Sequence, residues 1–507
     1  MEIPNTRGMF LILDILSDCN GPPSALIHIL DDDSLLIIFS LFRLLILDQS
    51  ESESTDDGTS DERGWNRERW WYALVHVCRR WRYLVLESAS HLRLSLVCAR
   101  GTPVAAMLAN STPIPLIINH ADQFYSIAEG DEQGIMLALQ HRDRVRRIRL
   151  RNPISRLQKF IMALDGEFPI LEYLSIQNQS YSIIPRTHRT SLNIPESFRA
   201  PHLRHLALID FDIPIESPLN MSMGNLVTLY LGVIPPSTYF RPDALFQRIS
   251  LMPHLKVLRI FFSPHFPSDE IEGQLLRVPI MRHVALPNLR CFGFKGASAY
   301  LEALLPWVLL PLLEKLEVYF LNQLTYSIPH LRRYVSTAEN FRPIAATLVF
   351  HTSNLKILAY PHRGARAYTL SIALDGMHLD WQVASAAQIF HAVGAVFSTV
   401  EHLTLQYERY FVSRRWNDKA HRTQWRELLR AFRNVKTIFI HDRLIEQLSH
   451  SLQPVEGESP TELLPELQEL SYHSIYASYN AFAQFIYARK IAGRPVTVIT
   501  VPVVGLR

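Results

Sequence analysis

The sequence predicts an α/β protein in which a small helical module near the N-terminus precedes a long array of strands and helices. Two observations support this prediction. The stretch from Trp70 to Leu86 is dense in aromatic, aliphatic and arginine side chains and contains no glycine or proline. From about residue 98 onward, a phrase of the form L-x-x-L-x-L, with aliphatic or aromatic substitutes, keeps returning. The first pattern is typical of a packed helix, and the second of a strand that buries one face.

The composition is that of a globular protein. Of the 507 residues, 48% are hydrophobic and 20% are charged, which suits a small domain followed by an extended array. The net charge of +3 gives no reason to expect nucleic-acid binding. No apolar run reaches the roughly 18 residues that are needed to span a bilayer, so we expect no membrane association.

The cysteines and the absent motifs bear on chemistry and location. The four cysteines are far apart and form neither a CxxC pair nor a zinc-binding spacing with histidine. A disulfide framework would need more of them, so the sequence predicts an intracellular protein, cytoplasmic or nuclear. No glycine-rich phosphate loop, GxSxG or HExxH motif occurs. We therefore predict no metal ion, no cofactor and no catalytic residue.

The N-terminal part divides into a lead-in and a helical module. Residues 1–25 end in Gly21-Pro22-Pro23, a sequence typical of a boundary. The helical module covers residues 26–97. At its start, Asp31 to Ser34 precede an apolar run, and their side chains are expected to cap the first helix.

The stretch from Trp70 to Leu86 predicts one further helix of this module. Read at helical spacing, one stripe collects Leu74, Val77, Cys78, Trp81 and Val85. A helix with so much aromatic surface needs a core to bury it, a partner, or both. Between the helices, residues 49–64 contain no aliphatic or aromatic side chain, so this insertion is predicted to be disordered and removable without loss of the fold.

Two short segments of this module resemble the F-box, a compact three-helix module. Leu30 to Phe39 reads LDDDSLLIIF, and Val77 to Leu84 reads VCRRWRYL. The matching positions are Leu30, Asp32, Asp33, Leu35, Leu36, Ile38 and Phe39 in the first segment, and Val77, Cys78, Arg79, Trp81, Arg82 and Leu84 in the second. Asp31 stands where the family usually has proline, and Ser34 where it has an aliphatic residue. The whole layout is similar to the F-box-like proteins of mushroom-forming fungi.

The recurring phrase predicts the architecture of residues 98–507. Its eleven copies begin at Val145, Leu171, Leu203, Leu226, Leu255, Leu289, Leu313, Leu355, Val400, Val435 and Leu467. Their spacing runs from the low twenties to the mid forties, whereas regular leucine-rich repeats run about 20–29 residues. We therefore predict an irregular leucine-rich-repeat-like α/β solenoid, with a parallel sheet on its concave face and helices at 241–251, 297–310 and 381–397. The alternative is a set of unrelated core strands in an ordinary α/β domain.

The run from His141 to Arg151, HRDRVRRIRLR, is the one strongly basic stretch. We interpret it as a strand that points Val145, Ile148 and Leu150 inward and its alternate arginines outward. The alternative is that the outward arginines bind an acidic ligand, because like charges along one face repel one another without a counterpart.

The resemblance implies a substrate-recognition subunit of a cullin–RING (SCF-type) ubiquitin ligase. Such a protein is not an enzyme: it binds a Skp-type adaptor and, through it, cullin, while its repeat region holds a target protein. The residues expected to bind the adaptor are Leu30, Leu35, Leu36, Ile38, Phe39, Val77, Cys78, Trp81 and Leu84. The alternatives are a leucine-rich interaction scaffold that does not bind the adaptor, and a hydrolase whose active site is not local in the sequence.

The target is expected to bind the open side of the strands. In each phrase, the residues between and after the inward pair point the other way, and following that alternation gives a column on the concave face. Its large or charged members are the predicted target-binding residues Arg149, Tyr230, Arg259, Lys295, Tyr319 and Phe439. These types, apart from lysine, are enriched at binding hot spots. The alternative is that the residue types on the concave face of such an array vary without any role in binding.

Overall fold

The structure is a computed structural model of the chain. It describes residues 30–48, 68–109, 113–121, 129–179, 193–211, 224–234, 241–264, 283–321, 323, 325–376, 378–408, 420–455, 457–459, 461–473 and 481–501. The predicted lead-in and the predicted insertion at 49–64 lie outside these residues. The chain forms two compact units: an N-terminal unit of residues 1–150 with 168–171, and a C-terminal unit of residues 151–167 with 172–507. The predicted α/β class is confirmed, with a large and mostly parallel sheet.

The N-terminal unit begins with helices. They are α2 (Asp32–Asp48), α4 (Tyr72–Val75) and α5 (Arg79–Glu87). The strands β1 (Leu96–Ala99), β2 (Leu116–Ala121) and β3 (Val145–Asn152) follow, with α6 (Val104–Ala109) and α7 (Glu129–Gln140) between them. The indole of Trp71 donates a buried hydrogen bond of 3.1 Å to the Ser95 carbonyl, which ties the start of α4 to the chain entering β1.

The predicted single helix from Trp70 to Leu86 is wrong, because the chain breaks between α4 and α5. Cys78 adopts an extended backbone conformation, with φ −157° and ψ 173°. Its Sγ accepts a hydrogen bond of 3.4 Å from the Trp81 amide, so the thiol caps α5. The break moves Val77 off the buried stripe, and its side chain is 52% exposed.

Helices α2 and α5 are tied together at the start of α2. Asp31 Oδ1 accepts a hydrogen bond of 2.7 Å from the Ser34 amide, which confirms the predicted capping for Asp31. Hydrogen bonds from Ser34 lower the pKa of the Asp31 carboxyl. The Arg80 guanidinium donates to Asp32 Oδ1 at 2.7 Å and to the Leu30 carbonyl at 2.6 Å. One arginine of α5 therefore holds the N-terminal end of α2.

The C-terminal unit consists of strands connected largely by helices. Its strands are β4 (Tyr173–Asn178), β5 (His205–Ile209), β6 (Thr228–Ile234), β7 (Val257–Phe262), β9 (Cys291–Gly296), β11 (Lys315–Phe320), β12 (Ala345–His351), β13 (Asn354–Tyr360), β14 (Leu370–Asp375), β15 (His402–Glu408), β16 (Thr437–Ile440), β17 (Glu469–His473) and β18 (Thr497–Val501). In space they run β4-β5-β6-β7-β9-β11-β14-β13-β12-β15-β16-β17-β18. Two short strands, β8 (Val284–Ala285) and β10 (Val308–Leu309), pair separately.

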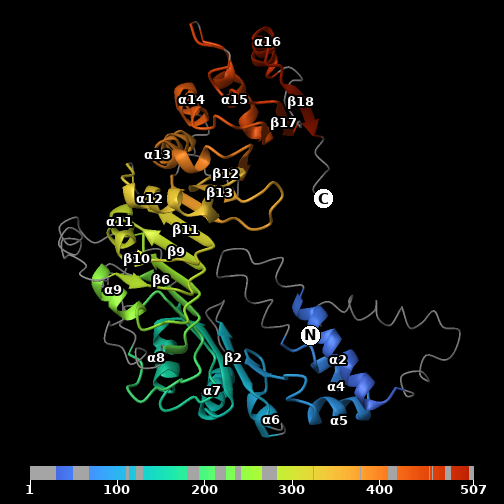
Figure 1. Ribbon diagram of the computed structural model, residues 1–507. Coiled ribbons are helices and arrows are strands. Elements are labelled where there is room, and N and C mark those ends of the chain that lie inside the picture. The colour runs from blue at the N-terminus through green and yellow to red at the C-terminus, as the bar shows by residue number, and fades with distance from the viewer. Residues whose placement is uncertain are drawn as a thin grey trace, which may run out of the picture. The chain divides into compact units, whose positions relative to one another are not determined.

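Helices of the C-terminal unit lie along one side of its strands (Figure 1). They are α8 (Ile154–Met162), α9 (Pro242–Ile249), α11 (Ser298–Leu304), α12 (Pro329–Thr337), α13 (Leu379–Phe397), α14 (Arg422–Arg430), α15 (Ile445–Leu452) and α16 (Ala483–Ile491). The predicted helices at 241–251 and 381–397 correspond to α9 and α13. The helix predicted at 297–310 is shorter, because a 3₁₀ turn at Leu305–Trp307 follows α11.

The strands bury alternate residues, as the phrase predicts. In β7, Leu258, Ile260 and Phe262 are buried while the residues between them are half-buried, and β11 and β15 repeat the pattern. One copy departs from the predicted parallel order: the phrase at Leu355 forms β13, which is antiparallel to both β12 and β14. Only Thr352 and Ser353 separate β12 from β13, and so short a connection makes a hairpin.

The same backbone connection recurs from strand to strand. Two successive amides at the start of one strand donate to a single carbonyl of the preceding phrase: Lys256 and Val257 to Val227, then Arg290 and Cys291 to Lys256, then Glu314 and Lys315 to Arg290. Asparagine side chains reinforce the spacing, since Asn225 and Asn288 donate to the Pro201 and Pro253 carbonyls at 2.8 and 2.9 Å.

A buried arginine closes the last part of the C-terminal unit. Arg489 of α16 is fully buried and donates to the carbonyls of Leu464, Pro465 and Leu467 at 3.0–3.2 Å. Leu464 has a φ of 50°, a left-handed conformation that is uncommon for a residue other than glycine. The guanidinium therefore donates to three carbonyls of an irregular turn, of which that of Leu464 also accepts a hydrogen bond from the Leu467 amide at 3.0 Å.

We expect Arg489→Met to destabilise this region by roughly 3 kcal/mol, because buried carbonyls lose their donors. Hydrogen exchange of the amides at 464–473 and 483–491 measures the change. The matched control is Arg494→Met, since Arg494 is exposed and its contact with Glu466 is long, at 3.4 Å. Equal exchange in the two variants would contradict the structural role of Arg489.

Candidate functional site

The predicted adaptor-binding residues divide into two groups. Leu35, Phe39 and Leu84 are buried, and Trp81 is half-buried with its ring 4.9 Å from that of Phe39 in an edge-to-face contact. These residues hold α2 against α5. Leu30, Leu36 and Cys78 are also half-buried, whereas Ile38 and Val77 are 43% and 52% exposed. Of the predicted set, only these last two are mainly available to a partner.

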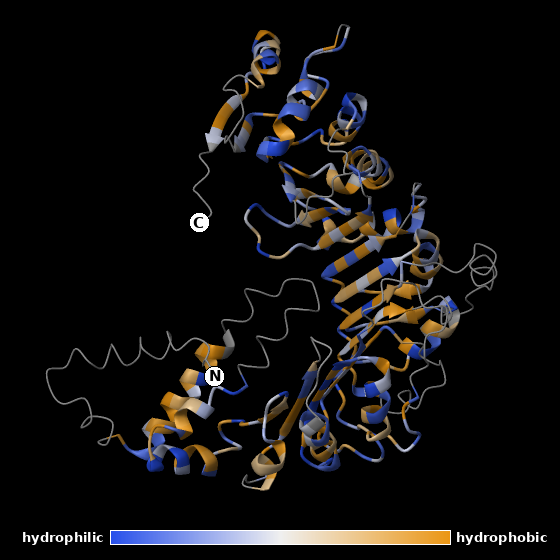
Figure 2. Cartoon of the chain, turned by 180° about the vertical axis from the view of Figure 1, so that it is seen from behind, coloured by the Kyte–Doolittle hydropathy of each residue, from blue (hydrophilic) through white to orange (hydrophobic). Residues whose placement is uncertain are grey.

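The exposed apolar surface of α2 is larger than the sequence analysis predicted. Ile37, Leu41, Leu44 and Leu45 are 53–60% exposed, and Tyr83 of α5 is 70% exposed. Apart from the adjacent pair, positions 37, 41, 44 and 45 are three, four, seven or eight residues apart, and this helical spacing could have predicted one apolar face from the sequence. Figure 2 shows hydrophobic residues along the length of α2. We call Ile37, Ile38, Leu41, Leu44 and Leu45 the α2 face. Buried Leu35 and Phe39 make the other side of the helix apolar as well. A helix that is apolar on both sides needs a covering surface on each of them.

The second candidate site lies on the open side of the C-terminal strands. Arg259 of β7 and Glu317 of β11 both stand opposite Gly293 of β9, and their side chains meet across it at 3.0 Å. A Cβ at Gly293 would lie 2.8 Å from the Arg259 side chain, so the absence of a side chain there makes room for the ion pair. Glycine inside a strand pattern is a sign of such a close approach.

Glu317 collects further partners. Lys315 Nζ lies 2.5 Å from Glu317 Oε1, and the Tyr368 hydroxyl donates to the same oxygen at 3.0 Å. Burial acts to raise the pKa of the Glu317 carboxyl, but the charges and hydrogen bonds of Arg259 and Lys315 outweigh it and lower that pKa. We call Arg259, Gly293, Lys315, Glu317 and Tyr368 the Glu317 cluster.

A second group of side chains lies beside this cluster. Lys295 Nζ is 4.4 Å from the centre of the Tyr319 ring, and the Tyr319 hydroxyl donates to Asp375 Oδ1 at 2.5 Å. Burial and the Asp375 carboxylate raise the pKa of the Tyr319 phenol, so it stays a neutral donor. The open side thus presents aromatic rings and cations that other side chains hold in place.

The predicted target-binding column needs two corrections. Arg149 is only 4% exposed, so it is not a surface residue. The strand register places Gly293 and Glu317 beside Arg259, while Lys295 and Tyr319 lie one row further along their strands. Tyr230 is directly opposite Arg259 as predicted, and Phe439 lies opposite Thr404 and Ser471. Apart from Arg149, all the predicted target-binding residues are half-buried.

No set of three or more histidine, cysteine, aspartate or glutamate side chains among the described residues is placed to hold a metal ion. The Cys98 thiol lies in β1, and burial raises its pKa to about 11, which keeps it protonated and unreactive. His351 lies on β12, which pairs with β15, and burial lowers its pKa. His402 lies on β15 and contacts the Thr437 hydroxyl of β16 at 2.7 Å.

No protein-family model and no curated protein sequence matches this chain. Within the part of the chain that the structure describes, no helix has both the length and the apolar character needed to cross a membrane.

We expect Glu317→Gln to destabilise the C-terminal unit by about 1–3 kcal/mol at pH 7, because Arg259 and Lys315 lose a charged, largely buried partner. The lowered pKa means that this stabilisation is fully present above the usual value of 4.5 and is lost as the pH falls through the folded-state value. The difference between wild type and variant therefore shrinks below pH 4.5.

Urea denaturation at pH 7 and at lower pH measures this difference. The control is Glu314→Gln, whose partner Arg290 forms an exposed pair, and its effect should stay small at both pH values. A difference for Glu317→Gln that does not depend on pH would contradict the charge-based account.

Proposed function

We propose that this protein is a substrate-recognition subunit of a cullin–RING ubiquitin ligase. In this proposal residues 26–97 are an F-box-like module that binds a Skp-type adaptor, and residues 98–507 are a leucine-rich-repeat-like solenoid that holds a target protein on the concave face of its sheet. The observation that carries the proposal is the α2 face, together with exposed Tyr83 of α5 and exposed Val77 in the break before α5, in the part of the chain that resembles an F-box.

The α2 face supports adaptor binding because water contact with so many aliphatic side chains is unfavourable. Burying a large aliphatic side chain contributes about 1.5–3 kcal/mol relative to leaving it exposed. Several such side chains on one helix are the usual anchors when a helix packs into a hydrophobic groove. The buried set of Leu35, Phe39 and Leu84 keeps the helix in place while the opposite side remains available.

The repeated connection between strands supports the solenoid interpretation. Most phrases of the C-terminal unit donate two successive amides to one carbonyl at the start of the neighbouring parallel strand, as stacked repeats do when each contacts only its neighbours. The target would then lie across the open side, where the Glu317 cluster and the Lys295–Tyr319 pair offer cations and aromatic rings. The protein would contribute proximity, by raising the concentration of its target near the ubiquitin-loaded enzyme.

Co-purification with a Skp-type adaptor tests the proposal. We expect wild type to capture the adaptor and Leu41→Glu to lose it, because a charge would enter an apolar interface. Leu41 is 55% exposed, so the fold should remain, with a change in unfolding free energy within about 0.5 kcal/mol.

The control is Met162→Glu, which places the same charge at a position of similar exposure, 57%, on α8 of the C-terminal unit. It should capture the adaptor like wild type. If wild type captures no adaptor, the protein is instead an interaction scaffold, the alternative that Asp31 and Ser34 leave open at positions where the family has other residues.

Removal of residues 49–64 should leave adaptor capture unchanged, because their polar and acidic side chains offer no packing surface. The measurement is the same co-purification with the shortened chain. Loss of capture would place this segment in the interface.

A further inference from the structure

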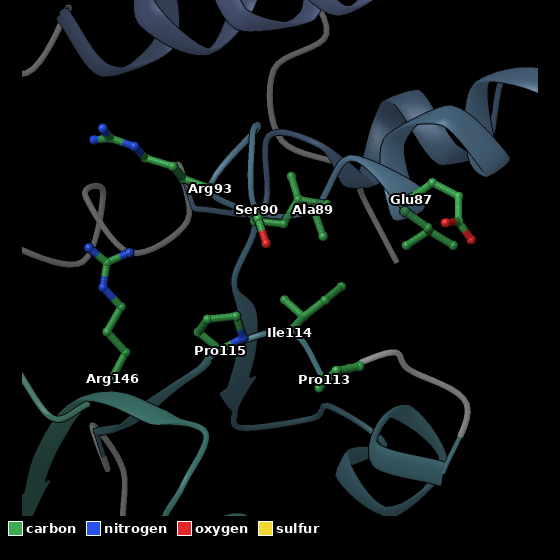
Figure 3. Close-up of a pocket in the computed structure, with 10 residues that line it drawn as sticks. Glu87, Ala89, Ser90, Arg93, Pro113, Ile114, Pro115 and Arg146 are labelled. Carbon is green, nitrogen blue, oxygen red and sulfur yellow. The ribbon is translucent and has the colours of Figure 1, made fainter. Parts of the chain in front are cut away.

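The N-terminal unit contains a pocket of about 460 Å³ (Figure 3). It lies at the end of α5, between the turn that leads to β1 and the segment that leads to β2. Its walls come from Leu86, Glu87, Ala89, Ser90, Arg93, Leu94, Pro113, Ile114, Pro115 and Arg146. The volume falls in the range of pockets that hold small molecules, about 300–1,000 Å³.

The pocket has an apolar part and a charged part. Ile114 and Leu94 are almost fully buried, and Pro113 and Pro115 flank Ile114. Figure 3 shows the guanidinium groups of Arg93 and Arg146 on one side of the pocket and the Glu87 carboxylate on the other. A ligand there would meet apolar side chains along its body and positive charge at one end.

A third arginine adds to the positive charge. Arg43 of α2 is half-buried, and burial is the main cause that lowers its pKa; the charges of Arg93 and Arg146 lower it further. Glu68 acts in the opposite direction, but the same carboxylate also pairs with Arg147 at 2.9 Å. Arg43, Arg93 and Arg146 are therefore close enough for their charges to act on one another on this side of the pocket.

The backbone at Arg93 is in an unusual conformation. Its φ is 51°, in the left-handed region that residues other than glycine seldom adopt. Hydrogen bonds on either side hold it, from the Leu92 amide to Ser88 and from the Leu94 amide to Ala89, both at 2.9 Å. Residues held in such conformations are common at ligand-binding sites.

We propose that this pocket binds the phosphate group of an organic phosphate. Arg93 and Arg146 bind the phosphate oxygens with the Ser90 hydroxyl nearby, and Ile114 with its neighbouring prolines contacts the apolar part of the ligand. The planar guanidinium matches phosphate oxygens with paired hydrogen bonds. A phosphate carries up to two negative charges and several acceptor oxygens, so it can bind both guanidinium groups at once.

The proposal also assigns a role to the basic run from His141 to Arg151. The residue that reaches the pocket is Arg146, not the alternate arginines that the sequence pattern pointed outward. Arg144 instead donates to the Ile114 carbonyl at 3.1 Å, which holds one wall of the pocket in place. The inference does not depend on whether the protein binds an adaptor.

Calorimetric titration of the full chain with phenyl phosphate at pH 7.5 and low salt tests the proposal. Binding is expected, and phenol, which lacks the charge, and inorganic phosphate, which lacks the apolar body, should each bind at least about tenfold more weakly, a loss of about 1.4 kcal/mol. At pH 5 the phosphate loses one charge while arginine keeps its own, so the affinity should fall severalfold.

Arg93→Gln and Arg146→Gln should each weaken binding of phenyl phosphate by about tenfold or more. The matched control, Arg79→Gln, removes an exposed arginine of α5 that does not line the pocket, and it should bind like wild type. If Arg146→Gln unfolds the unit, Arg146→Lys keeps the charge but loses the paired geometry, and it should bind more weakly than wild type.

A peptide with blocked ends and one phosphoserine, titrated in parallel, distinguishes the source of the phosphate. Tighter binding of the peptide identifies a phosphorylated protein, and tighter binding of phenyl phosphate identifies a small metabolite-like molecule; either supports the site. The proposal is overturned if neither compound binds at millimolar concentration, or if the Arg93 and Arg146 variants bind as wild type does.

Discussion

In the C-terminal unit, the paired donation of two amides to one carbonyl fixes how most of the parallel strands lie beside a neighbouring strand. The bond from Lys256 and Val257 to Val227 sets the offset of β7 against β6, and the next pair, at Arg290 and Cys291, sets β9 against β7. Backbone donors and acceptors supply this connection, so it tolerates variation in the loops between strands. Long and short connections can therefore alternate without any change in register.

This fixed offset decides what meets on the open side. Because β7, β9 and β11 are in register, Arg259, Gly293 and Glu317 form one row, and the glycine leaves the gap that the ion pair spans. A shift of one residue in β7 or β11 would turn Arg259 or Glu317 toward the helices, and the same shift in β9 would place a side chain other than Gly293 between them. Strand register thus brings the residues of the Glu317 cluster together, and their charges and hydrogen bonds then hold them there.

The sequence was sufficient where local periodicity decides the structure. The alternation of Leu258, Ile260 and Phe262, the cap at Asp31 and the helices α9 and α13 all follow from local patterns. The sequence was insufficient where a contact between distant segments determines which side of an element is buried. The exposed set on α2 could be found from its spacing, but not which side faces α5, because that depends on the Phe39–Trp81 contact.

Other differences arise from competition between local choices. The side chain of Cys78 can cap a helix as well as continue one, and capping prevails at that position. The phrase at Leu355 has the same letters as its parallel counterparts, yet its direction is set by the two residues that precede it in the hairpin. Lys295 and Tyr319 lie one row from Arg259 because each follows the inward pair of its phrase, whereas Arg259 lies between the two residues of its pair.

The antiparallel insertion has a consequence for synthesis of the chain from the N-terminus. The neighbour of β11 in the sheet is β14, although β12 and β13 are made first, and β12 finally pairs with β15. The unpaired edge of β11 must therefore wait on the ribosome until residue 370 has emerged, whereas the earlier strands can join as soon as they appear. In the finished sheet β13 and β12 reach β11 only through β14, so these three strands form one antiparallel group between β11 and β15.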